Sequence, residues 1–212
     1  MADLQTIVER LEAYIRAHDD GQRRLLIAIA GPPGAGKSTV AEALAETLNH
    51  LLPDRPAEAV PMDGFHYDNA ILDERGWRAK KGAPETFDVG GFFSLLQRLK
   101  NEAGDIAIPV FDRSADLARA SARMVSAHQR LLIVEGNYLL LDRPNWRELF
   151  PLFDHTIFLK PSIETIEERL VQRWLGYGFD QQTAEARAKG NDLANARLIL
   201  AESRPANIVV QD

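Results

Sequence analysis

The chain has 212 residues, enough for one α/β domain with a sizeable core and few for two. It is 45% hydrophobic and 26% charged, as globular proteins usually are, and its formal net charge of −6 argues against a general nucleic-acid binder, which needs a basic face. The absence of cysteine excludes disulfides and thiolate metal sites and fits a reducing compartment.

The chain carries no long apolar segment. Its longest apolar stretch, near residues 131–141, is interrupted by Glu135 and Asn137, whereas a membrane-spanning helix needs about 20 consecutive apolar residues. Charged residues at the start of the chain do not fit a signal peptide. We therefore expect a cytoplasmic protein that binds neither membrane nor nucleic acid.

Hydrophobic periodicity predicts alternating helices and strands in the first half of the chain. In chain order we predict a helix at residues 3–17, a strand at 25–30, a helix at 38–52, a strand at 57–62, a loop with a short helical piece at 68–86, a helix at 89–100 and an extended segment at 106–111. The second half continues with strands at 131–134 and 155–159, helices at 162–175 and 182–203, and a last strand at 206–210.

Strands that alternate with helices favour a mostly parallel sheet covered on both faces. The sequence contains no internal repeat and no composition shift that would mark a domain boundary. We therefore predict one α/β domain over residues 1–212, in which residues 176–192 could form a mobile flap.

The segment Gly31-x-x-x-x-Gly36-Lys37-Ser38 lies between a predicted strand and a predicted helix, which is the context of a P-loop. Backbone N–H groups of such a loop bind phosphate, Lys37 can reach the outer phosphates, and the Ser38 hydroxyl can bind Mg²⁺. The alternative is a glycine-rich turn that binds nothing. The predicted nucleotide site comprises Gly31, Pro32, Pro33, Gly34, Ala35, Gly36, Lys37, Ser38 and Thr39.

A P-loop indicates a nucleotide and not a reaction. A guanine-specific switch normally carries an Asn-Lys-x-Asp stretch, and this sequence contains none. We therefore expect ATP, with Mg²⁺, as the nucleotide.

Two carboxylates follow predicted strands: Asp63 after residues 57–62 and Glu135 after residues 131–134. Because the carboxyl ends of parallel strands meet at the edge where a P-loop lies, both should face the phosphates. Glu135 could hold Mg²⁺ together with Ser38, and Asp63 could accept the proton of an attacking hydroxyl group. Either residue could instead be an ordinary turn residue.

Further polar and aromatic residues are candidates for contacting the acceptor. They are Phe65, His66, Lys81, Glu85, Asn191 and Asn195. His66 could equally be a structural histidine, and the two asparagines could be ordinary polar positions of a helix surface. Lys80, Lys81 and Glu85 lie in the loop after Asp63 and could form a clamp, which would suit an anionic acceptor, or only a solvated face.

Several segments resemble one known group in their order along the chain: Gly31 to Thr39, MDGFHYDN, KKGAPETFDVGGF, IPVFDR, LIVEGNYLLL and ERLVQRW. The chain resembles the uridine kinase, phosphoribulokinase and bacterial pantothenate kinase group over residues 24–210, and most of all its bacterial members labelled as kinases of a fructose transport system. The resemblance implies a P-loop NTPase fold with a five-stranded parallel core sheet, helices on both faces and a helical lid at about residues 169–192.

The same resemblance implies roles for individual residues. It implies that Asp63 is the catalytic aspartate, that Glu135 is the acidic Mg²⁺ position, and that Arg169 and Arg173 are lid arginines that approach the phosphates. We expect Lys37 to act in catalysis as well, because its charge would offset charge on the transferring group.

Phe111, Asp112 and Arg113 match the segment that contacts the acceptor in uridine kinases. Uridine kinases have Tyr-Asp-Phe there, which speaks against a pyrimidine nucleoside, and the short lid speaks against pantothenate. We expect an ATP-dependent kinase that phosphorylates a hydroxyl group of a small metabolite, a sugar or a related compound. The alternatives are a uridine-like nucleoside, a pantothenate-like acceptor, or an ATP-binding regulator of a transport system without acceptor chemistry. The first helix could serve a homodimer or cap the sheet.

Overall fold

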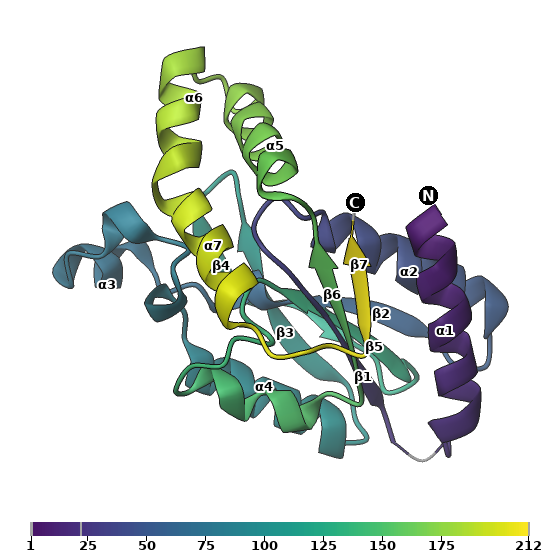
Figure 1. Ribbon diagram of the computed structural model, residues 1–212. Helices are drawn as coiled ribbons and strands as arrows, with labels where there is room; N and C mark the ends of the chain where they lie inside the picture. The colour runs from purple at the N-terminus through teal and green to yellow at the C-terminus, as the bar shows by residue number, and fades with distance from the viewer. Residues whose placement is uncertain (1, 22, 212) are drawn as a thin grey trace.

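The computed structural model describes residues 2–21 and 23–211. Within them lies a five-stranded parallel sheet with the strand order β2-β5-β1-β6-β7. Its strands are β1 (Leu25–Ala30), β2 (Ala57–Pro61), β5 (Leu131–Gly136), β6 (His155–Lys160) and β7 (Ile208–Gln211). Helices lie on both sides of this sheet (Figure 1), so the predicted fold class is confirmed.

The α-helices of the described residues differ in where they lie relative to the sheet. In chain order they are α1 (Ala2–His18), α2 (Lys37–Leu51), α3 (Asn69–Glu74), α4 (Val89–Asn101), α5 (Ile163–Gly176), α6 (Gln181–Arg187) and α7 (Leu193–Glu202). Helices α1 and α2 cover one face of the sheet and α4 the other, while α5 and α6 rise above the sheet (Figure 1). None of the helices in the described part of the chain is both long and apolar enough to span a bilayer.

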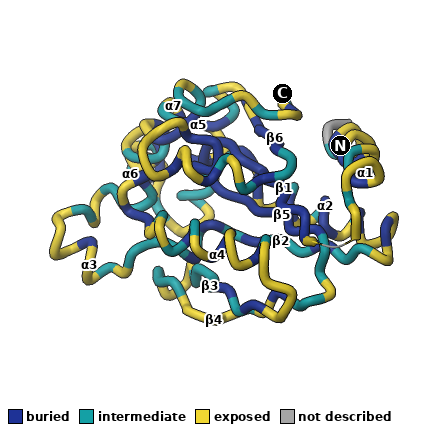
Figure 2. Tube along the Cα trace, turned by 90° about the horizontal axis from the view of Figure 1, so that it is seen from below, coloured by how far each residue is buried: buried dark blue, intermediate teal, exposed yellow. Residues whose placement is uncertain are grey.

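Strand β1 explains why the sheet is buried on both faces. Successive side chains of a strand point to opposite faces. Accordingly, Leu25, Ile27 and Ile29 pack in the core under α1 and α2, whereas the residues between them pack in the core under α4. The continuous apolar run is what a central parallel strand requires, and Figure 2 shows β1 and its neighbour β5 as buried strands inside the molecule.

Helices α5, α6 and α7 pack on one another through a small core of their own. It contains Ile166, Leu170, Val171, Ala184, Ala188, Leu193 and Ala196. The single helix predicted at residues 182–203 was wrong, because a π-helical turn, Ala188–Asp192, separates α6 from α7 and Gly190 has non-helical angles of φ −77° and ψ −114°.

A two-stranded antiparallel hairpin, β3 (Ile106–Asp112) and β4 (Leu117–Val125), lies outside the main sheet. The extended segment predicted at residues 106–111 corresponds to β3. Strand β4 was missed because most of its side chains are exposed, so no apolar alternation marks it. The hairpin packs against the short 3₁₀ turn Met62–Phe65 that follows β2.

Candidate active site

The P-loop joins β1 to α2 and its glycines meet two different steric demands. A Cβ atom on Gly31 would lie 2.5 Å from the carbonyl oxygen of Leu159, so only glycine fits where the loop passes β6. Gly36 precedes the first helical residue and adopts a left-handed conformation, φ 83°, which favours glycine. The loop thereby delivers the N-terminus of α2, with its free N–H groups, to the edge of the sheet.

Lys37 is buried at this edge, with only 8% of its surface exposed, and its Nζ donates to the carbonyl oxygen of Pro32 at 2.9 Å. Burial lowers the pKa of Lys37 to about 8, against the opposing attraction of Glu135 and Asp63. The ammonium group is therefore still mostly charged at pH 7, and an arriving phosphate would stabilise that charged form further.

Glu135 ends β5 beside the P-loop. Its Oε1 accepts a hydrogen bond from the Ser38 hydroxyl at 3.1 Å. Burial, and next the negative charge of Asp63, raise the pKa of Glu135. A carboxylate and a hydroxyl oxygen at the phosphate-binding edge are ligands that suit Mg²⁺ shared with a nucleotide.

Asp63 lies on the 3₁₀ turn directly after β2. Strand β2 pairs in parallel with β5, with Pro61 opposite Glu135, so the two carboxylates leave the sheet at the same edge. The Asp63 carboxylate is paired with Arg113 of the hairpin, whose Nη2 lies 3.2 Å from Asp63 Oδ2.

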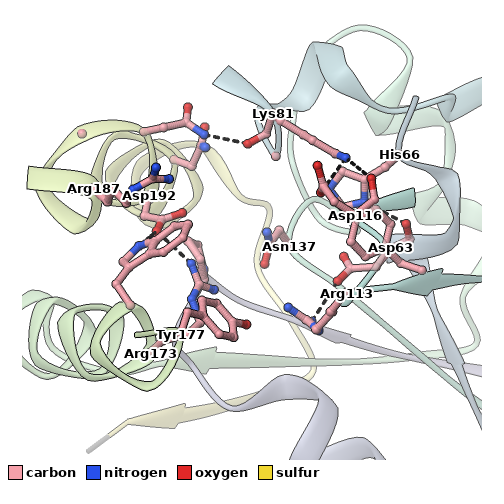
Figure 3. Close-up of a pocket in the computed structure, with 18 of the residues that line it drawn as sticks. Asp63, His66, Lys81, Arg113, Asp116, Asn137, Arg173, Tyr177, Arg187 and Asp192 are labelled. Carbon is pink, nitrogen blue, oxygen red and sulfur yellow. Dashed lines mark hydrogen bonds and ion pairs between the residues drawn. The ribbon is translucent and has the colours of Figure 1, made fainter. Parts of the chain in front are cut away.

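One cavity of about 1040 Å³ connects these groups. Its wall is formed by the P-loop, the segment after β2, the hairpin and the lid helices. In Figure 3, Asp63, His66, Lys81 and Asp116 lie on one side, Arg173, Tyr177, Arg187 and Asp192 on the other, and Asn137 between them. Phosphate-binding and proton-accepting groups therefore face one shared space.

His66 forms part of this wall with a defined tautomer. Its Nδ1 lies 2.8 Å from the Asp63 carbonyl oxygen, which can only accept, so Nδ1 carries the proton and Nε2 is left as an acceptor. Its ring contacts those of Phe87 and Phe111, with centroids 4.1 and 4.7 Å away. Burial lowers the pKa of His66, which keeps the ring neutral near pH 7.

Lys81 lines the cavity and connects the loop of residues 68–86, the acceptor-side loop, to the hairpin. Its Nζ contacts Asn69 Oδ1 at 2.7 Å, Asp116 Oδ1 at 2.8 Å and the Asp116 carbonyl oxygen at 2.9 Å. It also lies 4.9 Å from the centre of the Phe111 ring. Because the Asp116 carboxylate offsets the charge of Lys81, Lys81 is not a free cation. Its contacts hold the loop against the hairpin turn and so stabilise this wall of the cavity.

The lid places two predicted arginines differently. Arg173 lines the cavity and donates to Asp192 Oδ2 at 2.8 Å. Arg169 instead lies against the P-loop, with Nη1 3.4 Å from the carbonyl oxygen of Gly34. Arg173 is therefore the arginine already directed into the cavity.

The two predicted asparagines lie on the lid side of the same cavity. Asn191 donates to the carbonyl oxygen of Lys81 at 2.9 Å, which bridges the lid and the acceptor-side loop. Asn195 is only 6% exposed, and its amide has no hydrogen-bond partner among the described residues although it lines the cavity. It is thus available to a ligand.

Three residues predicted to contact the acceptor point away from the cavity. Phe65 packs against Phe92 in the core, with ring centroids 5.0 Å apart. Glu85 pairs with Lys80 at 2.7 Å on the outer side of the loop. Asp112 accepts from the Ser114 hydroxyl and from backbone N–H groups of the hairpin turn. Their positions support structural roles, because each already has a local partner.

Sequence reasoning missed several residues that line the cavity: Arg78, Asp116, Asn137, Arg187 and Asp192. Asn137 carried a signal, since it directly follows the acidic strand end at Glu135. The others are polar side chains whose direction no apolar periodicity predicts, and only the folded loop, hairpin and lid bring them together.

The chain matches the phosphoribulokinase / uridine kinase family over residues 26–177. It is 40% identical over 191 residues, 90% of this chain and 78% of the relative, to uncharacterized protein YggC of Escherichia coli (strain K12). It is 34% identical over 209 residues, 94% and 89% of the two chains, to a Schizosaccharomyces pombe protein provisionally named uridine kinase C227.14.

A crystal structure from Silicibacter sp. TM1040, of a protein provisionally named a fructose transport system kinase, is 46% identical with a TM-score of 0.89, covering 99% of this chain and 97% of that one. The family match spans well over half of the chain, and the fold and the P-loop agree with it. The chain therefore belongs to the phosphoribulokinase / uridine kinase family, whose members are kinases that phosphorylate a hydroxyl group of a small molecule.

Proposed function

We propose that the chain transfers the γ-phosphate of ATP to a hydroxyl group of a sugar or a related small metabolite. One observation carries the proposal: Asp63 lines the same cavity as Lys37, Ser38 and Glu135. A phosphate donor site and a carboxylate that can accept the hydroxyl proton then face each other, as phosphoryl transfer requires.

The nucleotide is ATP, bound with Mg²⁺. The P-loop N–H groups and Lys37 hold its phosphates, and Ser38 and Glu135 supply protein ligands to the metal. The metal would neutralise charge on the transferring group, and Arg169 and Arg173 would add positive charge from the lid.

The acceptor lies between Asp63, the hairpin and the lid. The amide of Asn195 and Nε2 of His66 have no hydrogen-bond partner among the described residues, and such groups suit a hydroxyl-rich acceptor. Arg113 beside Asp63 adds a donor where an aromatic residue would favour a nucleoside base. Uridine-like and pantothenate-like acceptors remain the alternatives within the kinase class.

Residues 1–212 act as one kinase domain, with a lid at about residues 169–192. The protein works in the cytoplasm on a small-molecule partner. Closure of the lid would exclude water and so suppress hydrolysis of ATP.

The deciding experiment measures ATP consumption with a panel of sugars, polyols, sugar acids, nucleosides and pantothenate, each with Mg²⁺. We expect one chemical class to raise ATP consumption far above the acceptor-free rate, and Lys37→Ala to abolish the increase. ATP binding without turnover for every acceptor would instead favour a nucleotide-binding regulator of a transport system.

A further inference from the structure

Asp192 occupies a special position at the junction of the lid helices. It is the last residue of the π-helical turn Ala188–Asp192, and one of its carboxylate oxygens, Oδ2, accepts two hydrogen bonds from α5. Arg173 Nη2 donates at 2.8 Å and the indole Nε1 of Trp174 donates at 2.9 Å. The carboxylate thus holds two neighbouring side chains of α5 from the opposite side of the lid.

Arg173 is held in this way with part of its guanidinium still free. It lines the cavity, and its positive charge is close enough to Lys37 to oppose the charged form of that lysine. Its Nε is buried without a hydrogen-bond partner in the described structure, so the bond to Asp192 is its one side-chain hydrogen bond there, beside a cation–π contact with the Trp174 ring at 5.5 Å. A guanidinium anchored through one terminal nitrogen retains a second for a phosphate oxygen.

The turn that carries Asp192 is itself tied to the acceptor side of the cavity. The preceding residue, Asn191, donates to the carbonyl oxygen of Lys81 at 2.9 Å, and Figure 3 shows Lys81 on the opposite side of the cavity from Asp192. Non-helical angles at Gly190 create the kink before these two residues. Two adjacent residues of one turn therefore have partners on different sides of the cavity: Asn191 binds the acceptor-side loop, and Asp192 binds Arg173.

We propose that Asp192 is a positioning residue that presents Arg173 to the transferring phosphoryl group, and that Asn191 fixes the turn from which it does so. This inference rests on the proposed kinase function. A donor contributes most to phosphoryl transfer when it is oriented before the charge develops. A long arginine side chain loses considerable rotamer entropy when it is fixed, and the half-buried carboxylate of Asp192 fixes it before the nucleotide arrives.

The test compares five variants, Asn191→Ala among them, with the unaltered chain in steady-state kinetics, using the best acceptor of the panel and also ATP alone. Asp192→Asn keeps the size and removes the charge, Arg173→Met removes the donor, and the double variant combines them. Asp180→Asn is the matched control, because Asp180 is a lid carboxylate that caps α6 through Thr183 and does not touch Arg173.

We expect Asp192→Asn to lower kcat about tenfold with the KM for ATP nearly unchanged, and Arg173→Met to lower kcat roughly 10²-fold. The double variant should be no slower than Arg173→Met alone, because the carboxylate acts through that arginine. Asn191→Ala should lower kcat less than Asp192→Asn. The control Asp180→Asn should match the unaltered chain in kcat and in Tm.

Three results would overturn the positioning role: an unchanged kcat for Asp192→Asn, a change in its KM for ATP alone, or a full additional loss of kcat in the double variant. Transfer by the unaltered chain would still support the kinase function in each case. A lower Tm for Asp192→Asn together with losses that add to those of Arg173→Met would assign Asp192 to stability only. An unaltered chain that neither hydrolyses ATP nor phosphorylates any acceptor would overturn the kinase function itself, and with it the role of Arg173.

Discussion

Ser38 and Glu135 are 97 residues apart in the chain, yet the Ser38 hydroxyl lies 3.1 Å from Glu135 Oε1. The parallel pairing of β1 with β5 creates this contact, since Ala30 lies opposite Gly136 and both strands end at the P-loop edge. A hydroxyl and a buried carboxylate at hydrogen-bond distance form two adjacent oxygen ligands. The pair would exchange its mutual hydrogen bond for a shared cation when Mg·ATP binds.

Glu135→Gln should therefore change the response to Mg²⁺ more than the binding of ATP itself. The amide keeps the volume but loses the charge that attracts the cation, so half-maximal activity should need several-fold more Mg²⁺ and kcat should fall. Activity measured against Mg²⁺ concentration checks this. Glu102→Gln, which alters an exposed acid at the end of α4 paired with Arg98, is the control. An unchanged Mg²⁺ requirement would remove Glu135 from the metal site.

The main sheet could be predicted from sequence because its strands are buried on both faces. Strands such as Leu25–Ala30 are continuous apolar runs, and the glycines of the P-loop mark the turn that follows β1. Parallel topology then places Asp63 and Glu135 at one edge without any knowledge of distances. This part of the candidate site depends on strand ends, which sequence patterns locate well.

The rest of the site depends on contacts between polar side chains of different segments, and an apolar period does not predict such contacts. Lys81 meets Asp116 only because the acceptor-side loop folds onto the hairpin turn, and Asp192 meets Arg173 only because Gly190 bends the lid. Phe65 shows the converse, because its position beside Asp63 indicated the cavity but its ring faces the core. Side-chain direction after a turn cannot be derived from spacing alone.

Lys37 should make ATP binding depend on pH. Its pKa in the nucleotide-free protein is lowered to about 8 by burial, and bound phosphates favour the charged form, so the pKa must be higher in the complex. Binding should therefore take up protons near and above pH 8, and affinity should fall as the pH rises further, by at most about tenfold per pH unit.

Calorimetry in two buffers with different ionisation enthalpies measures that proton uptake. Lys37→Met should bind ATP more weakly and lose the pH dependence in this range, because its side chain cannot titrate. An affinity of the unaltered chain that stays constant between about pH 7 and pH 9.5 would contradict a titrating Lys37 at the phosphate site.

Gly64 should be required for the close packing of the Asp63 turn on the hairpin. A Cβ atom at this buried position would lie 2.5 Å from the carbonyl oxygen of Pro109 in β3, and backbone atoms cannot yield as a flexible side chain can. Gly64→Ala should lower the free energy of unfolding by roughly 1–3 kcal/mol, as overpacking does. Gly176→Ala, where a new Cβ meets nothing within 4 Å, should change it little. Equal stability of the two variants in denaturant titrations would show that the hairpin moves aside without cost.

Asp63→Asn tests the chemical step most directly. The substitution keeps the size and removes the charge, so the proton acceptor for the attacking hydroxyl group is lost while the P-loop is untouched. Transfer to the acceptor should fall by orders of magnitude, whereas ATP affinity should stay close to that of the unaltered chain. Arg113 would lose its partner, but its side chain is 59% exposed, so stability should change little.

The control for Asp63→Asn is Asp68→Asn, five residues further along, where the side chain caps α3 by accepting from the N–H of Ala70. Asparagine serves that cap as well as aspartate does, so this variant should keep both transfer and stability. If Asp63 were also an ordinary turn residue, its variant would behave as the control does, because asparagine is equally suited to turns. Near-normal turnover of Asp63→Asn with the best acceptor would therefore remove Asp63 from the mechanism, whereas lost transfer with intact ATP binding and Tm would assign it the role of general base.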